Sequence, residues 1–160
     1  MKILFIALFL AFQLSSSAQP YHYRPAIAAI MDTSTKEEIL YCCSRACPDS
    51  ITSVWKPTSK EIKMLEQNFK KILFYKTDLC CGDNNIDNLN KYAFQYLGVT
   101  RNEKKLIFIN AFTTSTLKYF PKSKKLDKTP IMWCDGGNDF WAALFDLTRK
   151  EFIFLAINGH

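Results

Sequence analysis

The sequence has little glycine, proline or histidine. Five Gly and six Pro in 160 residues exclude a collagen-like or low-complexity chain. The length fits one domain, which excludes a TIM barrel, a multidomain enzyme and a repeat array. The two histidines, His22 and His160, lie near the two ends of the chain, and Cys134–His160 is the one nucleophile–base pair that can be imagined. The alternative for that pair is that Cys134 is disulfide-bonded or buried and that His160 is a frayed terminus. The sequence therefore offers little support for nucleophilic catalysis.

Long hydrophobic runs are also missing, apart from one near the start. Residues 3–14 form an uncharged apolar stretch that follows Met1-Lys2 and is too short to cross a bilayer comfortably. Small residues at Ser16 and Ala18 suit a signal peptidase. We therefore expect residues 1–18 to be a signal peptide and the mature chain to be periplasmic or extracellular, without a transmembrane segment.

The exported chain would be mildly basic. The full sequence has 21 Lys+Arg against 15 Asp+Glu, and removal of Lys2 leaves a small positive excess. Such an excess favours anionic surfaces such as lipid head groups or cell-wall polymers, although it commonly serves solubility alone. No zinc-finger or RNA-binding signature is present, so we expect no nucleic-acid partner.

Six cysteines remain in the mature part: Cys42, Cys43, Cys47, Cys80, Cys81 and Cys134. An even count in an exported chain indicates disulfides. Neighbouring Cα atoms, about 3.8 Å apart, are too close for a vicinal bond, which leaves the pairing open among the other combinations. We expect the first three cysteines to be linked to Cys80 and Cys81. Metal binding is the alternative, but the spacings do not match zinc motifs and no C-x-x-C is present, so we predict no metal and no cofactor.

The chain divides into a Cys-rich N-terminal segment, residues 19–54, and an α+β domain, residues 55–160. In the first part, residues 26–31 favour a short helix slightly over a strand. In the second, Thr58 and Glu61 form a capping box, and an apolar stripe predicts a helix over residues 59–74. The polar stretch 78–90 is predicted as a loop. Asp83, Asn85 and Asp87 there have the first three spacings of a calcium loop, but Asn88 and Phe94 stand where Gly and Glu are required.

Alternation of apolar and polar residues then predicts strands over 92–99, 106–112, 131–134, 139–147 and 151–157. The residues from Asp135 to Asn138, with two glycines, are typical of a hairpin turn between the third and fourth of these strands. A Lys-rich loop, with Lys118, Lys122, Lys124, Lys125 and Lys128, precedes the third strand. The predicted fold is α+β, with one main helix packed on a four- to five-stranded antiparallel meander and a disulfide-stapled N-terminal segment.

Several motifs together resemble a known group. They are Trp55-x-Pro57, Leu65-Glu66, Gln95-Tyr96-Leu97-Gly98, Trp133-Cys134-Asp135-Gly136-Gly137-x-x-Phe140-Trp141 and Asn158-Gly159. Over residues 55–159 the chain resembles small exported bacterial proteins without an established function, a resemblance that supports the compartment and the α+β domain but implies no reaction. The order of helix and strands is also similar to the cystatin-like architecture, yet the inhibitory Gln-x-Val-x-Gly motif is not matched. Similarity of fold does not carry function.

The residues around the Asp-Gly-Gly stretch are the candidate binding site: Trp133, Asp135, Gly136, Gly137, Asp139 and Trp141. The structural alternatives are that the aspartates cap their own turn and that the aromatic residues belong to the core. We predict a non-catalytic exported domain that binds or inhibits an unknown protein or a cell-envelope ligand. The alternative is a small exported hydrolase that uses Asp135 and Asp139 as paired carboxylates.

Overall fold

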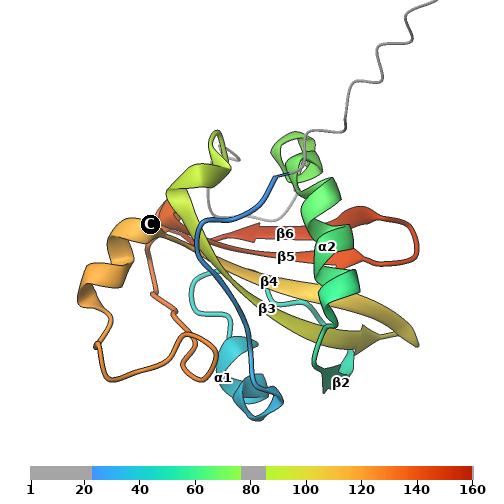
Figure 1. The fold of residues 1–160 in the computed structure, drawn as a ribbon, viewed down its shortest axis with the longest axis horizontal. Coiled ribbons are helices and arrows are strands. Elements are labelled where there is room, and N and C mark those ends of the chain that lie inside the picture. The colour runs from blue at the N-terminus through green and yellow to red at the C-terminus, as the bar shows by residue number, and fades with distance from the viewer. Residues whose placement is uncertain (1–22, 77–85, 160) are drawn as a thin grey trace, which may run out of the picture.

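A computed structural model describes residues 23–76 and 86–159, which form an α+β fold (Figure 1). The longest helix, α2 (Ser59–Asn68), lies across one face of a six-stranded sheet. The part of the N-terminal segment that contains the short helix α1 (Lys36–Ile39) and the long connection between β4 and β5 lie over the opposite face and one end of the sheet. In the described part of the chain, no helix is long and apolar enough to cross a membrane.

The sheet is mixed. Its strands are β1 (Ala28–Ile30), β2 (Ile51–Trp55), β3 (Tyr92–Arg101), β4 (Lys104–Thr113), β5 (Phe140–Asp146) and β6 (Glu151–Ile157). Neighbours from β3 to β6 pair antiparallel, β1 pairs parallel with β3, and β2 pairs antiparallel with β3. The α+β class is confirmed, whereas the antiparallel meander with four or five strands was wrong in sheet type and strand number. Strand β1 and all but the last residue of β2 come from residues 19–54, the predicted Cys-rich segment.

Two local predictions were also wrong. Within 26–31 the chain forms strand β1 instead of a helix, because it pairs with a β3 segment more than 60 residues away. The segment 131–134 pairs with none of the described strands. Its backbone is instead hydrogen-bonded by side chains from the sheet: Ile131 N–H donates to Gln95 Oε1 at 3.0 Å, and Ile131 O accepts from Asn110 Nδ2 at 2.8 Å.

The predicted helix and its capping box are confirmed. Thr58 Oγ1 accepts from the Glu61 amide at 3.3 Å, and the Glu61 carboxylate accepts from the Thr58 amide at 2.8 Å. The helix continues from α2 as a 3-10 helix, η2 (Phe69–Phe74). Leu65, Phe69 and other apolar side chains of this stretch pack against the sheet beside Phe94.

One disulfide joins the Cys-rich segment to the connection between β4 and β5, and a second closes a short loop within the segment. Cys42 pairs with Cys47 and Cys43 pairs with Cys134, with Cα atoms 5.3 and 5.0 Å apart. The predicted link of these three cysteines to Cys80 and Cys81 was therefore wrong. Those two residues, together with Asp83 and Asn85 of the calcium-like pattern, lie outside the described residues.

Candidate functional site

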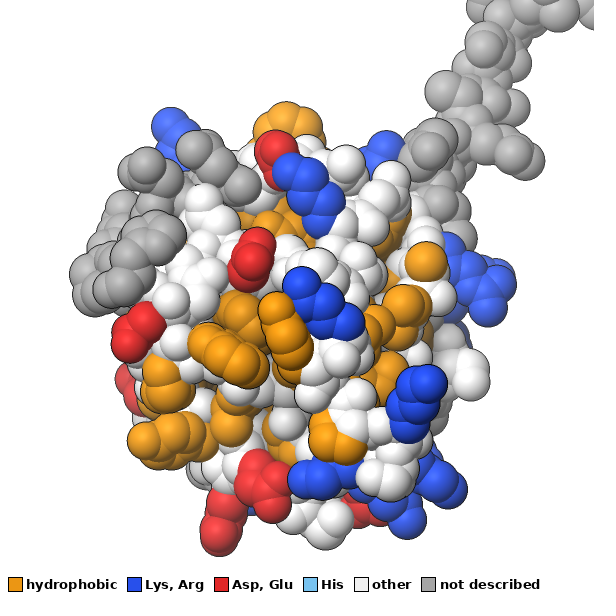
Figure 2. Space-filling view, turned by 90° about the vertical axis from the view of Figure 1, so that its left-hand side faces the viewer, with side chains coloured by type: hydrophobic (Ala, Val, Ile, Leu, Met, Phe, Trp, Pro, Cys, Tyr) orange, Lys and Arg blue, Asp and Glu red, His pale blue; other side chains and the backbone are white. Residues whose placement is uncertain are grey.

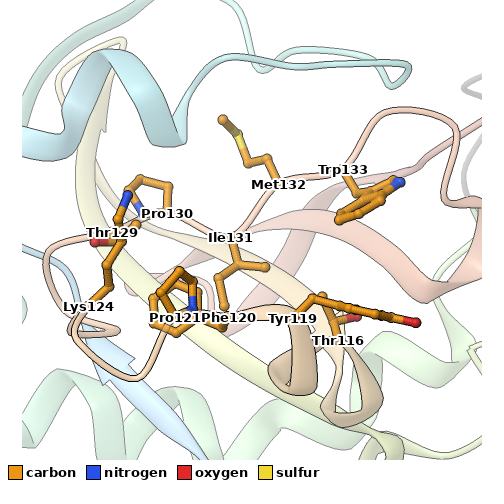
Figure 3. Close-up of a pocket in the computed structure, with 10 residues that line it drawn as sticks. All are labelled: Thr116, Tyr119, Phe120, Pro121, Lys124, Thr129, Pro130, Ile131, Met132 and Trp133. Carbon is orange, nitrogen blue, oxygen red and sulfur yellow. The ribbon is translucent and has the colours of Figure 1, made fainter.

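The candidate site is a groove between the end of β4 and the start of β5. After β4 the chain forms a 3-10 helix, η4 (Thr114–Tyr119), and then runs through the Lys-rich loop to Trp133. Two adjoining cavities, of about 180 and 280 Å³, open beside these segments and share Thr116, Tyr119 and Trp133. Figure 3 shows the residues that line the smaller one. We call these two cavities together the aromatic groove.

The groove is built around two exposed aromatic side chains. Tyr119 is 67% exposed and Trp133 is 55% exposed. Their ring centroids are 6.3 Å apart with an interplanar angle of 41°, and both rings lie on the same side of the groove (Figure 3). Lys118 Nζ lies 4.6 Å from the centroid of the Tyr119 ring, within the range of a cation–π contact. Large aromatic surfaces left side by side in water typically mark a binding site.

The rest of the lining mixes apolar, polar and charged groups. The smaller cavity is completed by Phe120, Pro121, Lys124, Thr129, Pro130, Ile131 and Met132, and the larger one by Ser115, Lys118, Gly136, Asp139 and Phe140. On this side of the molecule, hydrophobic side chains gather near the middle, and Lys and Arg side chains lie mainly toward the right-hand and lower edges of the view (Figure 2). A ligand that fits this lining has both apolar faces and polar groups.

A buried polar network holds the loop that carries Trp133. Gln95 Nε2 donates to the carbonyls of Leu126 and Thr129, both at 2.8 Å, and Gln95 Oε1 accepts from Ile131 N–H. Asn110 Nδ2 donates to Gln95 Oε1 at 2.9 Å and to Ile131 O at 2.8 Å. Because these amides provide the partners that an unpaired loop backbone needs, the loop has a defined course over the sheet.

Arg45 completes this network from the Cys-rich segment. Its Nη2 donates to Asn110 Oδ1 at 3.0 Å, and its side chain is buried. Burial lowers the pKa of Arg45 to about 10, since desolvation disfavours the charged form. Among the described residues, no carboxylate forms an ion pair with Arg45, and its Nε has no hydrogen-bond partner. The guanidinium therefore fixes Asn110, and through it the loop.

The Asp-Gly-Gly stretch connects three segments of the chain. Asp135 has a φ of +58° and accepts a hydrogen bond from Ser44 Oγ of the Cys-rich segment. Gly137, with a φ of +52°, donates from its amide to Gly159 O at 2.9 Å. A Cβ on Gly136 would lie 2.3 Å from the Phe140 ring, so this position needs glycine. The predicted hairpin turn was wrong: no strand precedes these residues, which lead into the 3-10 helix η5 (Gly137–Asp139) and then β5.

The structure thus separates the six predicted site residues. Trp133, Gly136 and Asp139 line the groove, whereas Asp135 and Gly137 line neither cavity. Trp141 is fully buried, with its ring 5.6 Å from Tyr92 and 5.8 Å from Phe94, and is not accessible to a partner. Of the two tryptophans in the candidate site, Trp141 therefore belongs to the core, as the structural alternative predicts, whereas Trp133 does not.

Sequence reasoning missed Tyr119, the residue that pairs with Trp133. The signal for it is present in the run Lys118-Tyr119-Phe120-Pro121, where two aromatic residues interrupt the Lys-rich loop. Trp133 itself is held at its carbonyl, which accepts from Asn158 Nδ2, and through the neighbouring Cys134 disulfide. These contacts fix the backbone of Trp133 and leave its ring free to contact a ligand.

The acidic groups of this region do not converge. Ser44 holds the carboxylate of Asp135 outside the groove, and Asp139 lines the larger cavity without a second carboxylate. Over residues 23–76 and 86–159, no cluster of three or more His, Cys, Asp or Glu side chains is placed to hold a metal ion.

The comparisons with known proteins add no activity that could be carried over to this site. The resemblance to small exported bacterial proteins stays a prediction, and the groove has to be interpreted from its own chemistry. No protein-family model, no curated protein and no solved structure matches the chain.

Proposed function

We propose that this chain is an exported, non-catalytic binding domain and that the aromatic groove is its binding site. One observation carries the proposal: Tyr119 and Trp133 lie exposed and side by side over two adjoining cavities. Removing a large aromatic side chain from water contributes about 2 kcal/mol of favourable free energy. A ligand that covers both rings would therefore gain a substantial binding free energy.

Export is supported by two independent features. The sequence begins with Met1 and the basic Lys2, followed by a short apolar stretch and small residues before position 19. Two disulfides, Cys42–Cys47 and Cys43–Cys134, join described segments, and such bonds persist in oxidising compartments. The groove depends on the second disulfide, because Cys134 follows Trp133 directly.

The hydrolase alternative has less support from the site. A pair of catalytic carboxylates must face one substrate cleft, but Asp139 lines the groove and Asp135 does not. Asp139 is better suited to accept hydrogen bonds from a ligand's hydroxyl or amide groups.

The test is an NMR titration of the oxidised, isotope-labelled protein with soluble envelope saccharides and peptides. A ligand of the groove should shift the indole N–H signal of Trp133 and leave that of the buried Trp141 unchanged. Trp133→Ala and Tyr119→Ala should each weaken binding of that ligand by 10-fold or more, which corresponds to at least about 1.4 kcal/mol. Tyr41→Ala is the matched control, because Tyr41 is 64% exposed and lines neither cavity.

Two results would overturn this proposal. Binding that the Trp133 and Tyr119 variants leave unchanged would place the site elsewhere. Turnover of a saccharide or peptide in the same samples, lost in Asp139→Asn, would show that the domain is a hydrolase.

A further inference from the structure

We infer that the ligand of the aromatic groove is a carboxylate-bearing polysaccharide. One sugar ring would stack on the Tyr119–Trp133 pair, and an acidic group would lie at Lys118 and Lys124. This inference rests on the proposed function, because it names the ligand class of that same groove.

The size of the two cavities favours a chain of small units. Pockets for compact drug-sized ligands commonly measure about 300–1,000 Å³, whereas these cavities measure about 180 and 280 Å³ and share one aromatic wall. Each cavity therefore suits one small unit of a ligand that continues from one cavity into the other. A polysaccharide has this repeating form.

The chemistry of the lining fits a sugar ring. A pyranose has an apolar C–H face and a rim of hydroxyl groups, so it needs an aromatic surface beside hydrogen-bonding side chains. Tyr119 and Trp133 provide the surface. Ser115, Thr116 and Asp139 line the larger cavity next to the rings and can exchange hydrogen bonds with hydroxyl groups.

The distribution of charge favours an acidic ligand. Residues 118–128 contain five lysines and one acid, Asp127. Lys124 lines the smaller cavity, whose described lining includes no acid, whereas Lys118 shares the larger cavity with Asp139. Lys122, Lys125 and Lys128 lie in the same loop outside the lining. A carboxylate at Lys118 or Lys124 gains a charge-assisted contact, and the remaining lysines attract the polymer at longer range.

A lipid surface would satisfy the lysines but not the shape of the site. Tyr119 and Trp133 line two cavities between η4 and the segment 129–136, which a saccharide unit can fill and the flat surface of a bilayer would leave unfilled. We therefore assign the acidic groups to a polysaccharide.

The experiment compares oligogalacturonate and oligoglucuronate with their methyl esters, which keep the sugar rings and remove the charge. Titration calorimetry of the oxidised protein at low salt should show at least one acid form binding 10-fold or more tightly than its ester. This preference should shrink at 0.5 M NaCl, because salt screens exposed charges. The double variant Lys118→Ala/Lys124→Ala should lose most of the preference for the acid. Lys122→Ala/Lys125→Ala is the control with the same change in net charge and should keep it.

The outcomes separate this inference from the proposed function. Equal affinity for acid and ester, lost in Trp133→Ala, would overturn the assignment of an acidic ligand and leave the binding site standing. If both lysine double variants lost the preference for the acid equally, the preference would depend on overall charge alone, and the assignment of an acidic ligand to the groove would also be overturned. Tighter binding to anionic phospholipid vesicles than to either acid would assign the surface to a membrane. Binding that neither aromatic variant changes would overturn both proposals.

Discussion

The two faces of the sheet are covered in different ways. On one face, α2 and η2 place Leu65, Phe69 and Ile72 against a continuous apolar surface that includes Phe94 and Tyr96. On the other face, the sheet presents two buried amides, Gln95 and Asn110, among its apolar residues. These amides bind backbone groups of a loop without regular secondary structure, and the disulfide Cys43–Cys134 joins the covering segments.

The difference shows what each kind of covering can do. A helix satisfies its own backbone hydrogen bonds and needs only an apolar stripe to dock. An irregular loop needs outside partners for its backbone, and the amide side chains of Gln95 and Asn110 supply them. A loop held in this way can leave large side chains in water. The loop between β4 and β5 does so at Trp133, in the aromatic groove.

The largest expected effect belongs to the helix-covered face. Phe69 is fully buried and its ring contacts four others, those of Tyr23, Phe94, Tyr96 and Phe152. Phe69→Ala should lower the free energy of unfolding by about 3–5 kcal/mol, because it removes a large core side chain. Chemical denaturation measures this loss. Phe74→Ala, in the same 3-10 helix but 83% exposed, should change stability by less than about 0.5 kcal/mol. Equal effects would contradict the packing of η2.

Loss of the disulfide that joins the segments on the other face should lower both the stability of the protein and its ligand affinity. The bond Cys43–Cys134 joins residues 91 positions apart, and its replacement by two serines should cost about 2–4 kcal/mol. Ligand affinity at the groove should fall as well, since Trp133 precedes Cys134. The matched control replaces Cys42 and Cys47, which are five positions apart, and should cost less stability and leave the Trp133 signal unshifted. A folded protein with unchanged affinity after loss of Cys43–Cys134 would show that this bond does not position the groove.

Breaking the polar network should have a somewhat smaller effect. Asn110→Leu leaves Arg45 and the Ile131 carbonyl without a partner and should destabilise the protein by roughly 2–3 kcal/mol. Adding Arg45→Met should recover part of this loss, because it removes a buried cation that then has no acceptor. A double-mutant cycle measures the coupling between the two residues. Strictly additive losses would show that Arg45 does not act through Asn110.

The elements that could be predicted from the sequence are those with a local pattern of residues. The helix over 59–74 was predictable because the capping box and the apolar stripe are local patterns. The four strands β3 to β6 match four of the predicted strand segments within a few residues, since their alternation is also local. The α+β class followed from these elements.

The parts that the sequence did not predict depend on distant contacts. Strand β1 has three residues, too few for a periodic signal, and it exists through its parallel pairing with β3. The segment 131–134 has the composition of a strand, but its partners are side chains of Gln95 and Asn110. In the site, Trp133 was predicted from its motif, whereas its neighbour Tyr119 comes from η4, and nothing local relates the two residues.

The smallest expected effect concerns the start of α2, where a local signal alone determines the structure. Thr58→Ala removes the side-chain acceptor for the Glu61 amide and should cost about 1 kcal/mol. Thr58→Ser keeps the hydroxyl and should retain most of that stability. Thermal unfolding measures both variants, and the NMR signal of the Trp133 indole reports on the groove in the same samples. We expect that signal to stay unshifted, because α2 covers the other face. A shift would show that the two faces are coupled through the sheet and that the groove is not held by the loop network and disulfide alone.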